Sequence, residues 1–265
     1  MKFGVLGPLR VIAGDCGEPG TVSAARLRAL LAVLLWRAGQ PVPADELAEL
    51  VWDGAPPRRA PDATRVLIMR LRRQLDERAA ARIVTRAPGY VIEISGDELD
   101  AAQFEARTQE TGAAVRAGQW VQAARTASKA LGLWRGTPLA DVPSQLLRDK
   151  WVPHLEELHA QSLQWRIEAD LHDGRHEQLI PELRDLVTRH PLREHIHGQL
   201  MLALYRCGRQ AEALAAYQDA RAGLVTELGA EPGPGLRDLH QRILSADPAL
   251  TTAEPTRPCR RPADP

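Results

Sequence analysis

The feature that most limits the possible folds is a change in hydrophobic pattern near residue 97. Before this point, short apolar runs typical of strands alternate with segments in which apolar residues recur every three or four positions. Beyond it only the helical spacing persists, interrupted by Gly and Pro residues. The pattern predicts a mainly α chain with small β elements: a mixed region at 1–96, an all-helical region at 97–246, and a disordered Pro-rich tail or linker at 247–265.

The mixed region contains two pairs of predicted strands and three predicted helices. The strands are expected at 3–7 and 9–12 and, on either side of a tight turn, at 83–85 and 90–94. The helices are expected at 23–38, 44–52 and 61–77. Ser23 is a candidate N-cap for the first helix, and Pro61 is well placed at the start of the third.

The helical region contains three segments of similar sequence, which begin at Gly118, Gly174 and Gly208. The last two glycines are 34 residues apart, which is the period of tetratricopeptide (TPR) repeats, in which pairs of helices stack side by side. The first spacing is 56 residues, and it fits the same array only if residues 133–152 are an insertion. The region is therefore expected to be a TPR-like helical array that is irregular at its start.

The charges of the chain are unevenly distributed, although 34 basic and 34 acidic residues give no net charge. Residues 1–96 carry 14 basic and 10 acidic side chains, whereas residues 97–265 carry 20 and 24. Within residues 58–86 there are nine arginines and three acidic residues, a local charge of +6. A positive segment on a neutral protein indicates that this part of the chain meets an anionic partner.

The third predicted helix gathers its arginines on one side. A helical wheel gives it an apolar stripe formed by Ala63, Leu67, Ile68, Leu71 and Leu75. The opposite face carries Arg65, Val66, Met69 and Arg73, with Arg70 and Arg72 at its flanks. Guanidinium groups on such a face can bond guanine O6 and N7 in the major groove or bind phosphates. The alternative is a solvated surface helix. Two preceding helices, a basic hairpin that follows, and Arg58 and Arg59 just upstream favour DNA binding.

Other classes of function have little support in the sequence. The three cysteines, Cys16, Cys207 and Cys259, are widely separated, and no metal-binding, phosphate-loop, nucleophile-elbow or zinc-protease motif is found. The longest apolar run, 29–36, is far shorter than the roughly 20 residues of a membrane-spanning helix. There is no signal-peptide pattern at the N-terminus. We therefore expect a non-enzymatic protein without cofactor or metal, located in the cytoplasm on the nucleoid and not bound to membranes.

Several motifs resemble those of a known class of bacterial regulators. Residues 3–94 resemble the winged helix-turn-helix of OmpR-type regulators, since residues 70–75 are similar to the end of their recognition helix and Gly89-Tyr90 is similar to their wing. Residues 100–248 resemble the bacterial transcriptional activation domain in four motifs, at 130–136, 190–194, 202–214 and 228–232. The two domains in this order are similar to the Streptomyces antibiotic regulatory protein (SARP) family over about 245 of the 265 residues.

The resemblance implies a sequence-specific transcriptional activator of secondary-metabolite genes. Members of the family bind direct repeats of double-stranded DNA near the −35 promoter element and recruit RNA polymerase, including its sigma factor. Repeats occupied on the same face of the duplex are spaced by about one helical turn, or roughly 10–11 base pairs. Head-to-tail repeats also imply head-to-tail self-association of the protein on DNA.

The resemblance also implies roles for individual residues. By position, Arg70 would read bases with Val66 beside it, while Arg65, Arg72 and Arg73 would hold phosphates. Arg86 would reach the adjacent minor groove from the wing. The complete set of expected DNA-binding residues is Arg58, Arg59, Arg65, Val66, Arg70, Arg72, Arg73, Thr85, Arg86 and Tyr90. Pro43, before the second helix, and Pro88, in the wing, depart from the family pattern.

Two alternatives remain open. The chain can be the N-terminal part of a larger regulator with an ATPase and further repeats, which would bind the same kind of DNA. It can also be a protein adaptor, in which the TPR-like array is the functional part and the winged helix serves only packing. The arginine-rich outer face argues against the adaptor, because packing does not require it.

Overall fold

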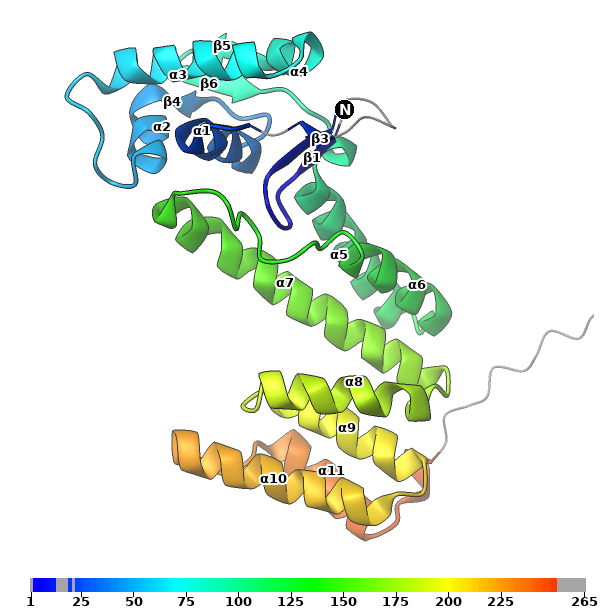
Figure 1. The fold of residues 1–265 in the computed structure, drawn as a ribbon. Coiled ribbons are helices and arrows are strands. Elements are labelled where there is room, and N and C mark those ends of the chain that lie inside the picture. Colours follow the sequence, from blue (N-terminus) through cyan, green and yellow to red (C-terminus); the bar gives the residue numbers. More distant parts are fainter. Residues whose placement is uncertain (1, 13–18, 21, 252–265) are drawn as a thin grey trace, which may run out of the picture. The chain divides into compact units, whose positions relative to one another are not determined.

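The computed structural model describes residues 2–12, 19–20 and 22–251, which form two compact units (Figure 1). The first unit comprises the residues up to 109 together with 128–161, and the second comprises 110–127 and the residues from 162 onward. Helices α5 (Asp100–Arg116), α6 (Trp120–Leu131) and α7 (Gln145–His172) contribute residues to both units. Part of the helical region that was expected from residue 97 onward therefore packs with the N-terminal strands.

The first unit contains two small antiparallel sheets. One consists of β1 (Lys2–Gly4), β2 (Arg10–Ile12) and β3 (Pro19–Gly20), with Phe3 opposite Val11. The other has the order β4–β6–β5 and consists of β4 (Val42–Pro43), β5 (Ile83–Arg86) and β6 (Gly89–Ile92). The predicted hairpin around residues 86–89 is therefore confirmed, and its second strand also pairs with β4.

The first unit contains the three expected helices and a fourth that was not expected. Helix α1 (Ala25–Trp36) is surrounded by other residues, and from Ala29 to Leu35 its side chains are at most 1% exposed. Helices α2 (Ala44–Val51) and α3 (Ala60–Gln74) pack against it. The expected helix at 61–77 ends early, because Asp76 begins the separate helix α4 (Glu77–Arg82) by accepting a 2.8 Å hydrogen bond from the Ala79 amide.

The prediction that Ser23 caps the first helix is wrong. Ala24 occupies the N-cap position of α1, and no side chain caps the helix there. The Ser23 hydroxyl instead accepts a 2.8 Å hydrogen bond from the Gln74 side-chain amide. A long-range contact between the beginning of α1 and the end of α3 thus takes the place of a local cap.

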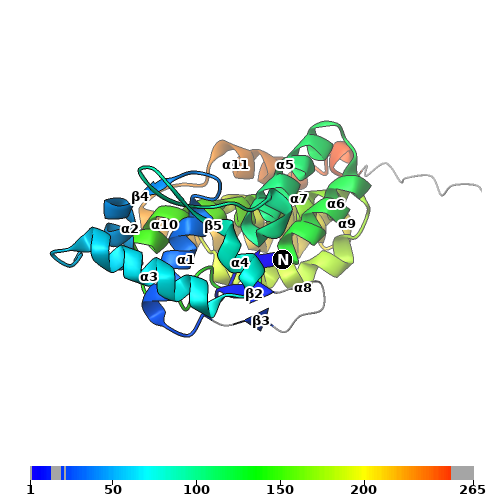
Figure 2. The ribbon, with the colours of Figure 1, turned by 90° about the horizontal axis from the view of Figure 1, so that it is seen from above.

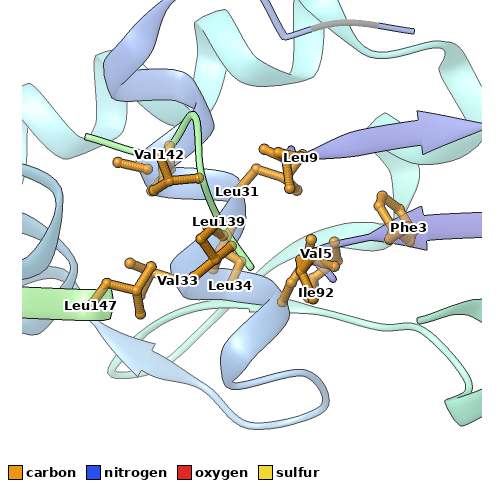
Figure 3. Close-up of a cluster of buried hydrophobic side chains, with 14 of the residues drawn as sticks. Phe3, Val5, Leu9, Leu31, Val33, Leu34, Ile92, Leu139, Val142 and Leu147 are labelled. Atoms are coloured by element: carbon orange, nitrogen blue, oxygen red, sulfur yellow. The ribbon is translucent and has the colours of Figure 1, made fainter. Parts of the chain in front are cut away.

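The hydrophobic core of the first unit combines N-terminal residues with a segment that follows α6 (Figure 3). Phe3, Val5 and Leu34 are at most 1% exposed, and Leu139 and Val142 lie beside them, fully buried. Leu139 and Val142 belong to the loop between α6 and α7. This loop and the first half of α7 account for the residues expected to be an insertion in the repeat pattern, and they complete the core of the first unit.

Asp100 bonds the N-terminal strands to this loop. Its carboxylate accepts hydrogen bonds from the Val5 and Leu6 amides, at 2.8 and 3.1 Å, and pairs with Arg135 at 3.1 Å. The Arg135 amide in turn donates to the Leu6 carbonyl at 2.8 Å. Because the Val5 and Leu6 amides bond to Asp100 instead of to a neighbouring strand, β1 is shorter than the strand expected at 3–7.

Asp141 forms a second connection of the same kind. It accepts a 2.7 Å hydrogen bond from the Leu9 amide and pairs with Arg28 at 3.3 Å. The Leu139 amide adds a 3.0 Å bond to the Val5 carbonyl. We refer to the bonds made by Asp100 and Asp141 as the seam. The seam joins residues that are about a hundred positions apart in the sequence.

The described residues of the second unit form helices and turns and contain no strand. Helices α8 (His176–Arg189), α9 (Glu194–Arg206), α10 (Gln210–Leu228) and α11 (Pro234–Leu244) follow one another, and each packs on its neighbour in the sequence, α10 on both α9 and α11. The three glycines of the similar segments, Gly118, Gly174 and Gly208, all have a positive φ, between 67° and 81°. Glycine adopts this conformation without steric cost, so each of the three segments marks a tight turn between two helices.

The first residues of the predicted tail are folded. Asp247 accepts a 2.9 Å hydrogen bond from the Ala249 amide and begins a 3₁₀ turn at Pro248–Leu250. Leu250 is buried in the core of the second unit. The rest of the predicted tail, 252–265, lies outside the described residues.

Candidate nucleic-acid interface

Helix α3 is held to the first unit by the stripe that its sequence predicts. Of this stripe, Leu67, Ile68 and Leu71 are buried, whereas Ala63 and Leu75 are partly buried. Thr64, which the predicted stripe did not include, is buried as well. Pro61 is in the first turn, where the helix needs no amide donor, and Asp62 is close to it. An acid near the start of a helix and arginines near its end both stabilise it through the helix dipole.

The opposite side of α3 is exposed and basic. Figure 2 shows α3 lying across α1 on the outside of the first unit. Arg65, Arg70 and Arg73 are exposed there, together with Val66 and Met69. We call these five residues the arginine face. Its three arginines form no hydrogen bond or ion pair with another described residue, so all five N–H donors of each guanidinium are available for a partner.

Arg72 differs from the arginines of this face. It is partly buried, and its Nε and Nη2 both donate to the Ile83 carbonyl, at 3.2 and 2.6 Å. Ile83 begins β5, so Arg72 ties the last turn of α3 to the hairpin. The sequence gives no sign of this bond, because a helical wheel shows which way Arg72 points and not which carbonyl lies beyond it.

The hairpin carries the other expected contacts. Thr85 and Arg86 are exposed on β5, and Tyr90, directly opposite Thr85 on β6, is partly buried. The Arg86 Nη2 forms a 2.7 Å ion pair with Glu93, in which both side chains remain about half exposed. A charge this exposed is only weakly held by its partner, so Arg86 can exchange Glu93 for a phosphate at small cost.

Gly89 places the hairpin close to β4. A Cβ atom on Gly89 would lie 1.9 Å from the Val42 carbonyl oxygen and 2.9 Å from the Pro43 Cα. These distances exclude any side chain, so only glycine allows β6 to pair with β4 at this register. Pro43 ends β4, and α2 begins at the next residue without a side-chain cap.

The structure thus groups the predicted residues on three adjoining elements. Arg58 and Arg59 are exposed in the turn that leads into α3, where Arg59 holds the N-cap position. The arginine face follows on α3, and Thr85, Arg86 and Tyr90 follow on the hairpin. Met69 was not among the expected DNA-binding residues, although the helical wheel already placed it on the outer face.

An exposed helix with unpaired guanidinium groups suits the major groove of B-DNA, which is about 12 Å wide and admits one α-helix. A neighbouring two-stranded hairpin can then approach the backbone or the next minor groove. Among the described residues there is no group of three or more His, Cys, Asp and Glu side chains that could hold a metal ion. In the same part of the chain, no helix is both long and apolar enough to cross a membrane.

Two family models match the chain, and together they cover most of it. Residues 21–92 match the family described as "Transcriptional regulatory protein, C terminal". Residues 99–244 match the "Bacterial transcriptional activator domain". The order is that of a winged helix-turn-helix region followed by an all-helical activator domain.

Individual relatives agree with these matches. The regulatory protein DnrI of Streptomyces peucetius is 35% identical, and the match covers 97% of each chain. The regulatory protein AfsR of Streptomyces coelicolor is 42% identical over 99% of this chain, which spans about a quarter (26%) of that relative.

A solved structure has the same fold. It is that of Mycobacterium tuberculosis EmbR in complex with a low-affinity phosphopeptide, with a TM-score of 0.86 and 33% identity. The match covers 95% of this chain and 67% of that one. With two domain families in the expected order and a relative matched from end to end, this chain belongs to the Streptomyces antibiotic regulatory protein family of transcriptional regulators.

Proposed function

We propose that this protein is a sequence-specific transcriptional activator of secondary-metabolite genes. It binds tandem direct repeats near the −35 promoter element through α3 and the hairpin, and it recruits RNA polymerase, including the sigma factor. The observation that carries the proposal is the arginine face, whose three arginines are exposed beside an exposed hairpin and have no partner in the part of the chain that the structure describes. A positively charged face of this kind has little effect on solubility and stability, and it attracts an anionic partner.

The residues divide between base reading and phosphate binding. Arg70 reads a base in the major groove, with Val66 next to it, and Arg65 and Arg73 hold phosphates on either side. Arg58 and Arg59 meet the backbone ahead of α3, and Arg86 enters the minor groove from the hairpin, supported by Thr85 and Tyr90. Arg72 contributes a phosphate contact only through the three N–H donors that its two bonds to the Ile83 carbonyl leave free.

Two copies bind head to tail on the repeats, through surfaces that differ on the two copies. The helical region has four more acidic than basic residues, so it adds little affinity for phosphates. It provides protein contacts instead, with the second copy and with polymerase. This chain matches 26% of the length of AfsR. The alternative function is therefore that of a larger regulator that carries the same kind of DNA-binding region.

Selection of binding sites from a random duplex library at near-physiological salt tests the DNA-binding part. We expect enrichment of a direct repeat with a spacing of about 10–11 base pairs. Arg70→Ala should weaken binding to the selected site by about 1–3 kcal/mol and relax the preference at one position, whereas Arg73→Ala should weaken all sequences alike. If no sequence is enriched and Arg70→Ala has no effect, the proposal is wrong and the adaptor becomes the better explanation.

In vitro transcription with the purified polymerase holoenzyme tests the activator part. A template that carries the selected repeats beside the −35 element should give more transcript when the protein is added. The matched control template has the repeats displaced by half a helical turn, about 5 base pairs, which moves the protein to the opposite face of the duplex. Equal stimulation on both templates, or repression on both, would contradict recruitment of polymerase by contact.

A further inference from the structure

The arginine face contains two apolar side chains that the described residues of the first unit leave exposed. Val66 is 40% exposed and Met69 is 45% exposed, and among the described residues of this unit they are the large hydrophobic side chains left exposed. Their neighbours on the inner side of α3, such as Leu67 and Ile68, are buried. The exposure is therefore local to the face that the proposed function turns toward DNA.

Val66 and Met69 also lie together. They are three positions apart on α3, which places them on adjacent turns of the same face with Cβ atoms about 5–6 Å apart. Arg65, Arg70 and Arg73 surround the pair. A partner for this surface must therefore offer apolar groups that are bordered closely by acceptors or negative charges.

The major groove of DNA offers this combination at thymine. The thymine C5-methyl group is the apolar group on the major-groove edge of the base pairs, and acceptors of neighbouring bases and phosphates lie around it. Successive base pairs are about 3.4 Å apart, so side chains 5–6 Å apart meet positions one or two steps from each other.

Building on the proposed function, we infer that Val66 and Met69 select thymine by contact with its 5-methyl group, at two positions of each half-site that lie within two base steps. The specificity of the protein then has two sources. Arg70 selects guanine by hydrogen bonds, and the apolar pair selects adjacent thymines by burial of methyl groups.

The test replaces single thymines of the selected operator by uracil, which removes the methyl group and keeps the base pair. For wild-type protein we expect the dissociation constant to rise about fourfold at each contacted thymine, the effect of burying one methyl-sized group. Met69→Gln keeps side-chain length and helix propensity. At one of these positions, this variant should bind the duplex with thymine and the duplex with uracil equally well. Val66→Ala, which removes two methyl groups and keeps one, should clearly reduce the effect of uracil at the other position.

Leu228→Gln is the matched control, because Leu228 is 59% exposed at the end of α10 and is not on the arginine face. This variant should show the same uracil sensitivity as wild type. If no thymine is sensitive to loss of its methyl group, or if sensitivity persists in both Met69→Gln and Val66→Ala, the inference is overturned while the proposed function stands. If no operator is enriched at all, the proposed function fails first and the inference fails with it.

Discussion

The seam and the arginine face use the same residue type for different purposes. In the seam, Arg28 and Arg135 are 23% and 22% exposed, and each pairs with an aspartate that also accepts backbone hydrogen bonds. On the arginine face, Arg65, Arg70 and Arg73 are exposed and have no partner among the described residues. Pairing and burial, rather than the presence of arginine, distinguish a structural charge from a binding charge.

Pairing also determines how many arginines of the basic segment, residues 58–86, are available to a partner. Residues 58–86 carry a formal charge of +6, but three of their nine arginines are engaged within the first unit. Arg72 bonds to the Ile83 carbonyl, Arg82 pairs with Glu98, and Arg86 pairs with Glu93. Arg72 keeps its charge and commits only two of its donors, whereas the charges of Arg82 and Arg86 are offset by glutamates. The arginines without a partner among the described residues therefore lie mainly on α3 and in the turn before it.

The largest effect should come from Gly89→Ala. This variant tests whether the hairpin of the proposed interface depends on the pairing of β6 with β4. The added Cβ would collide with the Val42 carbonyl oxygen, so β6 must separate from β4. We expect a loss of about 3 kcal/mol in the free energy of unfolding, measured by urea denaturation. Gly96→Ala is the control, because apart from its neighbours in the chain no described residue has an atom within 4 Å of the Cβ position there. Equal stability of the two variants would show that the hairpin is not fixed to β4.

Asp100→Asn should have the next largest effect. It tests whether the seam contributes to stability and not to DNA binding. The change removes the negative charge that faces Arg135 and one acceptor of the Val5 and Leu6 amides, so we expect a loss of about 2–3 kcal/mol in the free energy of unfolding. DNA affinity, measured well below the melting temperature, should be unchanged. The exposed Asp149→Asn serves as the control. A weakened affinity for DNA at full folding would mean that the seam and the arginine face are not separate in function.

Arg73→Ala is the reciprocal test, since it should change binding and leave stability alone. Loss of one phosphate contact should reduce the slope of log affinity against log salt concentration by about 1. The free energy of unfolding should stay within about 0.5 kcal/mol of wild type, because Arg73 has no partner among the described residues of the first unit. An unchanged slope would exclude Arg73 from the interface.

The smallest effect is expected from Glu93→Gln. This variant tests whether Arg86 acts as a structural arginine, paired with Glu93, or as a DNA-binding one. Removing the charge of Glu93 releases Arg86 from an exposed ion pair, so binding to DNA should become tighter by at most about threefold at low salt. The gain should disappear when Arg86→Ala is added to the same chain. A gain that survives in the double variant would come from the general charge of the surface and not from Arg86.

Patterns of short range in the sequence predicted much of the fold. The buried stripe of α3, the hairpin around residues 86–89 and the turn glycines at 118, 174 and 208 are all present. Each depends on neighbours within a few positions, where helical or strand periodicity acts. Helix α4 was missed although a local signal existed, because Asp76 is a good N-cap in front of an alanine-rich segment.

Contacts of long range were not predictable in the same way. The hydrogen bonds from backbone amides to Asp100 and Asp141 in the seam join positions 94 to 132 residues apart, and no spacing in the sequence relates them. The same holds for Ser23, whose hydroxyl bonds to Gln74 rather than to the first turn of α1. For the candidate site, the outer face of α3 was predicted, but the separation of Arg72 from the other arginines required the Ile83 carbonyl to be located.

The bond from Arg72 to Ile83 has a consequence for the rates at which the protein meets and leaves DNA. Because it joins the last turn of α3 to the first strand of the hairpin, the two elements would reach the duplex connected to each other in the complex proposed above. Association would then need a single orientation and be governed by the charge of the exposed arginines, while dissociation would require the contacts of both elements to be released at once. A variant that frees the hairpin from α3, such as Arg72→Met, should therefore shorten the time that the protein stays on its operator and leave the rate of arrival nearly unchanged.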